Sequence, residues 1–187
     1  MSSRGRPDRR WRSSVRSTAL TRIAAGVVVE RRKAKSPWLD FVWRPIYVLV
    51  GTPSATPWTQ IGEEVGATTF YAGEAAIELH RTETANYRDN LSSGTPALWV
   101  VLRPRLANSS RSAFDILMVT ADPSEGEALT DAGNDLVATV PMPAAIIETI
   151  DRFIAEHHVE RPFNKRQRDR GGPRMPGFRS ENTENGK

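Results

Sequence analysis

The sequence predicts an α+β fold: a bent antiparallel sheet or small barrel of about seven short strands, with a C-terminal helix packed on it. Short runs of β-branched and aromatic residues outnumber the helical segments. The connections between these runs are too short for repeated strand–helix–strand crossovers, which favours antiparallel pairing. One amphipathic segment near the C-terminal end of this region has an apolar stripe that needs a sheet to cover.

The first strands come from three β-rich runs. Residues 23–32 are rich in β-branched side chains, and residues 38–50 alternate imperfectly between apolar and polar. Pro45 interrupts the second run, and because proline cannot donate to a strand ladder we expect a sheet edge or a bulge there. A loop rich in Gly and Pro over residues 51–57 precedes a third strand at 58–65.

The middle of the chain predicts two further short strands and a helix. Gly73 and Glu74 separate a strand at 68–72 from one at 75–80, in which apolar and polar residues alternate. We expect Thr82 to cap a short helix over residues 83–91.

Three strands and two helices complete the predicted domain. Asp122 has the side chain of a helix cap, and Pro123 suits the first turn that follows it. The last helix carries isoleucine and phenylalanine side chains at three- and four-residue spacing on one stripe, and Pro162 stops it. These elements are strands at 97–102, 114–120 and 136–140, a helix from Pro123 to near Gly133, and a helix at 144–158.

The net charge of +4 is unevenly distributed along the 187 residues. Residues 1–22 carry +6 and residues 160–187 carry +4, whereas the stretch between them carries −6. We therefore expect one globular domain over residues 23–163, a disordered basic extension at 1–22 and a disordered basic and polar tail at 164–187. A body with net negative charge argues against a nucleic-acid duplex lying along the folded face.

The composition also argues against several kinds of metal-binding, membrane-spanning and catalytic feature. The absence of cysteine excludes disulfides, thiolate zinc sites and iron–sulfur clusters. No apolar run approaches the ~20 residues of a membrane span, and we expect a cytoplasmic protein. No Gly-x-Ser-x-Gly turn or carboxylate pair points to a catalytic centre, so we expect no catalytic residue, metal or cofactor.

Two groups of residues are candidates for partner binding. The first combines aromatic and charged side chains of the kind enriched in interfaces, although tryptophan also fills small β cores: Trp38, Asp40, Trp43 and Arg44. The second stands where the last helix meets the basic tail: His157, His158, Glu160 and Lys165. Adjacent helical residues point about 100° apart, so the two histidines suit helix capping or packing better than one metal ion.

A set of short motifs runs in order through residues 22–170. In this order they resemble an uncharacterised proteobacterial domain family, whose members are often encoded beside formate dehydrogenase and sometimes labelled molybdopterin-guanine dinucleotide biosynthesis protein A. The resemblance implies a non-catalytic accessory or binding protein for the assembly or regulation of a molybdenum-dependent formate dehydrogenase, with that enzyme or its maturation factors as partners. The motifs include Val27–Arg32, Ser36–Pro45, Tyr87–Leu91, Val140–Pro143 and His157–Phe163.

Two alternative functions remain open at this stage. The basic residues of Arg161–Arg170 could bind nucleic acid or an acidic partner. The inherited label would instead imply a guanylyltransferase of molybdenum-cofactor biosynthesis. The segment Gly171–Gly177 is a poor phosphate loop for that reaction, because no strand precedes it and two prolines remove backbone donors.

Overall fold

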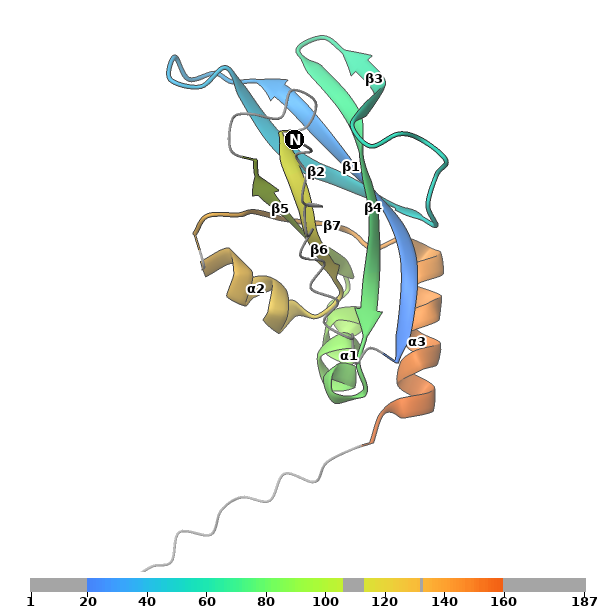
Figure 1. Ribbon diagram of the computed structural model, residues 1–187. Helices are drawn as coiled ribbons and strands as arrows, with labels where there is room; N and C mark the ends of the chain where they lie inside the picture. The colour runs from blue at the N-terminus through green and yellow to red at the C-terminus, as the bar shows by residue number, and fades with distance from the viewer. Residues whose placement is uncertain (1–19, 106–112, 132, 160–187) are drawn as a thin grey trace, which may run out of the picture.

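The computed structural model describes residues 20–105, 113–131 and 133–159. The described residues form a seven-stranded sheet that curls nearly into a barrel, with three α-helices (Figure 1). This confirms the predicted α+β class and the C-terminal helix. The strands are β1 (Thr21–Lys33), β2 (Phe41–Val50), β3 (Thr59–Glu64), β4 (Ala67–Leu79), β5 (Ala97–Pro104), β6 (Phe114–Thr120) and β7 (Leu136–Pro141), and the helices are α1 (Thr84–Ser92), α2 (Pro123–Asp131) and α3 (Ala144–His157).

The strand order is β2-β1-β4-β6-β5-β7, and β3 pairs with β4. All pairs are antiparallel except β4 with β6, which run parallel and meet at Ile77 and Val119. The sheet is therefore mixed, where the sequence predicts a purely antiparallel one. After β4 the chain passes through α1 and forms β5, which does not pair with β4. It then returns as β6, which lies between β4 and β5 and runs parallel to β4.

The prediction of two strands at 68–72 and 75–80 was wrong, because β4 continues unbroken through both. The register of β4 against β1 shifts beside Gly73, whose φ of 140° only glycine adopts readily. This residue forms a bulge and does not end the strand. A Cβ at Gly73 would lie 3.4 Å from Pro57 Cβ, so the close approach of neighbouring segments also favours glycine here.

Three predicted local signals can be compared directly with the structure. Pro45 lies on the edge strand β2, opposite a register shift in β1, which confirms the expected bulge. Asp122 Oδ1 accepts a hydrogen bond from the backbone N–H of Ser124 at 2.8 Å, as a cap does. The prediction for Thr82 was wrong: it lies within a 3₁₀ turn, Arg81–Glu83, that precedes α1.

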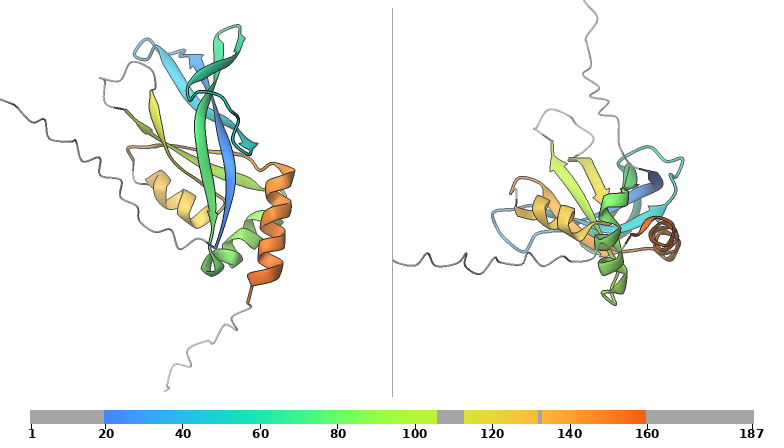
Figure 2. Two further views of the ribbon diagram at one scale, coloured as in Figure 1. Left: turned by 45° about the vertical axis from the view of Figure 1, so that its right-hand side comes forward. Right: turned by 90° about the horizontal axis from the view of Figure 1, so that it is seen from below.

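The core lies inside the curled sheet and extends under the helices at its lower end. The α3 stripe buries Ile146, Ile150 and Phe153, and it stands beside the first half of β1 (Figures 1 and 2). Tyr87 of α1 meets Phe153 with ring centroids 6.4 Å apart, so α1 and α3 close this end together. No helix within the described ranges is long and apolar enough to cross a membrane.

Candidate partner-binding surface

The turn between β1 and β2 projects beyond the rest of the sheet (Figure 1). Its base is closed by a hydrogen bond of 3.0 Å from the backbone N–H of Ala34 to the carbonyl of Asp40. At its end the Trp38 side chain is 89% exposed and that of Leu39 60%. Phe41 and Val42 at the start of β2 are also exposed. We call these four apolar residues, Trp38, Leu39, Phe41 and Val42, the hairpin surface; Phe41 and Val42 are consecutive in β2 and so lie on opposite faces of the hairpin.

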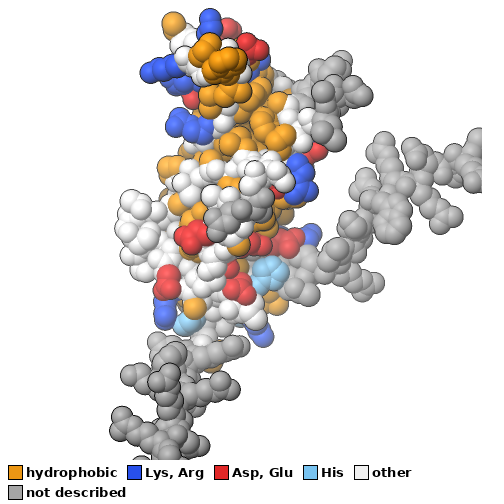
Figure 3. Space-filling model, turned by 90° about the vertical axis from the view of Figure 1, so that its left-hand side faces the viewer, with side chains coloured by type: hydrophobic (Ala, Val, Ile, Leu, Met, Phe, Trp, Pro, Cys, Tyr) orange, Lys and Arg blue, Asp and Glu red, His pale blue; other side chains and the backbone are white. Residues whose placement is uncertain are grey.

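Apolar side chains gather over this part of the molecule. Figure 3 shows them at the top of one face and continuing down its middle, with lysine and arginine side chains along the border. A soluble monomer rarely exposes several large apolar side chains side by side, and such groups often mark protein-binding sites. Aromatic side chains at the centre and charges at the rim are typical of such interfaces.

The four residues of the first predicted cluster do not share one face. Trp43 is half-buried and belongs to an aromatic group, its ring centroid 5.8 Å from Trp58 and 5.6 Å from Phe70. It therefore fills the open end of the core, while Trp38 stands in solvent. Arg44, the next residue, is exposed and lies 3.6 Å from Glu30. Asp40 is exposed at the turn.

Arg31 is a residue that the sequence interpretation missed. Its guanidinium lies 4.7 Å from the ring centroid of Phe41, 5.7 Å from Trp43 and 5.2 Å from Phe70. These distances are within the range of cation–π attraction. The period of two along β1 places Arg31 on the same face as the buried Val27 and Val29, and that alternation was the signal that could have found it.

His157 and His158 of the second predicted cluster lie at the end of α3, at the opposite end of the described domain from the β1–β2 turn (Figure 1). His158 Nδ1 lies 3.1 Å from Thr84 Oγ1, and its Nε2 lies 3.0 Å from Arg88 Nη1. The Thr84 hydroxyl donates to the Arg81 carbonyl, which leaves its oxygen to accept from Nδ1–H and leaves Nε2 to accept from Arg88. His158 thereby ties the end of α3 to α1.

Of the other members of this cluster, His157 lies within the described residues, and Glu160 and Lys165 do not. The His157 ring packs 4.7 Å from the Phe153 ring, measured between centroids, and its Nε2 lies 3.8 Å from the Glu156 carboxylate. Both contacts are local to α3 and suit packing at a helix end. Glu160, Lys165 and the Gly171–Gly177 segment lie outside the described residues, as do most of the charges of the two basic ends.

Tyr87 gives the α1–α3 end a titratable buried group. Burial raises the pKa of its hydroxyl to about 12, even though that oxygen accepts a hydrogen bond of 3.1 Å from the His80 backbone N–H. A raised pKa means that folding favours the protonated phenol. Its contribution to stability is complete below pH ~10 and is lost as the pH rises toward 12.

We therefore expect the free energy of unfolding to fall between pH 10 and pH 12, with roughly 2 kcal/mol of the fall due to Tyr87. Denaturant unfolding at several pH values measures this change. Tyr87→Phe, which removes the titrating hydroxyl, should show a correspondingly shallower fall. Identical pH dependence in the two proteins would contradict the assignment.

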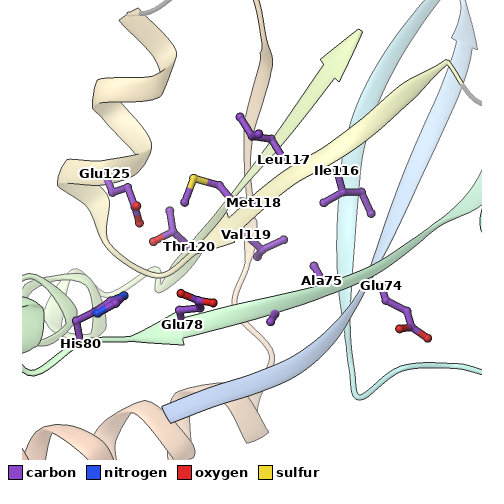
Figure 4. A pocket seen from close by; sticks show the side chains of 11 residues that line it. Glu74, Ala75, Glu78, His80, Ile116, Leu117, Met118, Val119, Thr120 and Glu125 are labelled. Carbon is purple, nitrogen blue, oxygen red and sulfur yellow. The ribbon is translucent and has the colours of Figure 1, made fainter. Parts of the chain in front are cut away.

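A cavity of about 440 Å³ lies between β4, β6 and the start of α2. Glu78 from β4 and Glu125 from α2 reach toward it from opposite sides (Figure 4). Glu78 already pairs with Arg22 at 2.5 Å, and Glu125 is exposed to solvent. Within the described ranges no three His, Cys, Asp or Glu side chains are grouped to hold a metal ion. The cavity is thus lined by both apolar and polar side chains, and its carboxylates are paired or solvated.

Comparison with known proteins places the whole described domain in one family. A family model described as a protein of unknown function (DUF3305) matches residues 24–167. No curated protein and no solved structure matches the chain. The matched region begins in β1, contains the hairpin surface and continues past the end of α3. Since it covers more than half of the sequence, the chain belongs to this family of domains of unknown function.

Proposed function

We propose that this protein is a non-catalytic accessory protein that binds a partner protein through the hairpin surface. The observation that carries the proposal is the 89% exposure of Trp38 beside the exposed Leu39, Phe41 and Val42. Tryptophan is among the residues that most often dominate binding energy in protein interfaces. Burying a large apolar side chain contributes roughly 1.5–3 kcal/mol, so even a few of these residues could hold a partner.

The way in which the hairpin is built also favours binding. Its base is held by the continuous pairing of β1 with β2 on one side and with β4 on the other. Behind it the aromatic group of Trp43, Trp58 and Phe70 packs against the core. Phe41 and Val42 lie on this supported strand pair, and Trp38 and Leu39 lie in the turn closed by the Ala34–Asp40 hydrogen bond. Such residues lose less conformational freedom on binding than the same residues on a free segment.

We propose a molybdenum-dependent formate dehydrogenase, or one of its maturation factors, as the partner. The resemblance of the ordered motifs to domains encoded beside formate dehydrogenase supports this choice. The motif Ser36–Pro45 includes all four residues of the hairpin surface. Assembly or regulation of that enzyme is the corresponding role.

The test is capture of the dehydrogenase by the tagged protein from cells that express both. We expect the enzyme to co-purify, and Trp38→Ala to reduce the captured amount roughly tenfold or more, because it removes the central aromatic contact. Tyr47→Ala is the matched control, since Tyr47 is an exposed aromatic residue farther along β2. Equal capture by Trp38→Ala and the control would contradict binding through the hairpin. Absence of co-purification, with normal dehydrogenase activity in a deletion strain, would contradict the partner.

The two alternative functions predict different results. A guanylyltransferase would form a guanylated product from molybdopterin, Mg²⁺ and GTP, whereas an accessory protein would form none. Binding of nucleic acid through the basic ends would weaken steeply with salt. It would be lost on deletion of residues 1–19 and 164–187, which leaves β1 intact.

A further inference from the structure

Arg31 is a charged residue that lies behind the hairpin surface, among aromatic rings at the open end of the core. Three rings surround its guanidinium, those of Phe41, Trp43 and Phe70, all with centroids within 5.7 Å. Phe41 belongs to the hairpin surface itself and is 47% exposed. The cation therefore lies directly behind the residues that we propose to contact the partner.

The hydrogen bonds of this guanidinium are incomplete. Its Nε is buried and has no hydrogen-bond partner. Its Nη2 makes one long bond of 3.4 Å to Thr68 Oγ1. Neighbouring arginines differ, because Arg32 and Arg44 both pair with Glu30. Among the described residues Arg31 has no carboxylate partner, and a buried donor without a partner costs about 1–3 kcal/mol.

We propose that Arg31 binds the side-chain carboxylate of an Asp or Glu in the partner, within a segment whose flanking residues are apolar. The inference rests on the proposed binding role and names the chemistry of the segment that docks. A carboxylate supplies the charge and the acceptors that the guanidinium lacks. The flanking apolar side chains cover Phe41, beside Arg31, and Trp38 and Leu39 in the turn.

The geometry allows the carboxylate to approach. Nη1 makes no hydrogen bond to a described residue and is not among the fully buried unpaired atoms, and Arg31 as a whole is half-buried. A carboxylate that reaches Nη1 and the neighbouring Nε would make the bidentate contact that the planar guanidinium favours. With water excluded by the rings, such a charged pair is stronger than one on an open surface.

Charge on the neighbouring strand favours an isolated carboxylate over an extended polyanion. Exposed Glu63 and Glu64 of β3 pair in register with Thr68 and Ala67 of β4, and Thr68 in turn faces Arg31 on β1. These two carboxylates would repel a run of phosphates laid across the hairpin. An acidic side chain in an apolar segment meets Arg31 without crossing them.

The experiment selects dodecapeptides from a random phage-displayed library on the full-length protein and then measures the affinity of the synthesised peptides. We expect selected peptides to carry Asp or Glu between apolar residues. Replacing that residue by Asn or Gln should weaken binding roughly tenfold, the value of a charged hydrogen-bonded pair. Arg31→Gln should cause a similar loss, and Arg31→Lys a smaller one because lysine keeps the charge without the planar fork.

Arg22→Gln serves as the matched control, because it removes an exposed arginine at the other end of β1 that already pairs with Glu78. It should leave peptide affinity unchanged. Thermal unfolding checks each variant, and if Arg31→Gln does not fold, the acidic and amide forms of one peptide on the unaltered protein decide the question.

Several outcomes would overturn the inference: selection of no peptide, selection without acidic residues, or equal affinity for the acidic and amide forms. A concentration-dependent dimer lost in Arg31→Gln would make a second copy of the chain the occupant and would also overturn it. The result is separable from the proposed function. Acidic apolar peptides that bind through Arg31 while the dehydrogenase fails to co-purify would leave this inference standing and remove the proposed partner.

Discussion

Replacing Gly126 by alanine is expected to lower the free energy of unfolding by about 3 kcal/mol. A Cβ at this position in α2 would lie 2.1 Å from Cγ and 2.3 Å from Cδ1 of Trp99. These atoms are at the fixed root of the indole ring, so rotation of a flexible end cannot relieve the overlap. The helix would have to move away from β5. The gain in helix propensity, about 1 kcal/mol, is too small to offset this.

Chemical denaturation of the two proteins measures the effect. Gly62→Ala is the control, since its Cβ would lie an ordinary 3.6 Å from Thr69 Cβ in a neighbouring strand. We expect the control to unfold within ~0.5 kcal/mol of the original protein. A similar midpoint for Gly126→Ala would show that α2 does not pack on Trp99 as described. Because α2 lies away from the hairpin turn, partner capture by the folded variant should be unchanged (Figure 1).

Replacing Asn90 by alanine is expected to cost about 3 kcal/mol of stability. Asn90 is 5% exposed, and its Nδ2 donates to the carbonyls of Ala97 and Ala121, both at 2.8 Å. Its Oδ1 accepts from the Ala97 backbone N–H at 3.1 Å. One side chain thus joins the end of α1 to the start of β5 and to the residue after β6. Its removal leaves three backbone groups without these partners.

Thermal or denaturant unfolding tests this prediction against Asp89→Ala, which alters the exposed neighbouring residue. The control should change stability little. Asn90→Asp should be worse than alanine, because a carboxylate would face two carbonyl oxygens and could donate to neither. If Asn90→Ala unfolds like the control, these three hydrogen bonds do not join α1 to the strands as described.

Features that depend on the chemistry of a single residue could be predicted from the sequence. The proline at position 45 cannot donate to a ladder, so the prediction of an edge or a bulge followed from the residue alone, and the structure has both. Gly73 was different, because a glycine with positive φ can either end a strand or form a bulge within it. Which of the two occurs depends on pairing with β1, a segment more than forty residues earlier. The parallel pairing of β4 with β6 is equally non-local.

The candidate site was predicted in part, and for a similar reason. Trp38 and Trp43 are the same residue type five positions apart, yet the first is exposed and the second packs in the aromatic group. Their difference arises because the hairpin turn extends past the neighbouring strands, which no local pattern records. Arg31 was overlooked because a charge in Glu30-Arg31-Arg32 suggests the solvated end of a strand. The structure instead surrounds its side chain with rings.

Hydrogen exchange on the purified protein, with and without formate dehydrogenase, tests partner binding through the hairpin surface most directly. We expect backbone amides from Lys33 to Trp43 to exchange more slowly in the presence of the enzyme, and Trp38→Ala to abolish that protection. Exchange at the end of α3, around His157 and His158, should not change. Protection confined to the α3 end, or none in the hairpin at saturating enzyme, would contradict the proposed mode of binding.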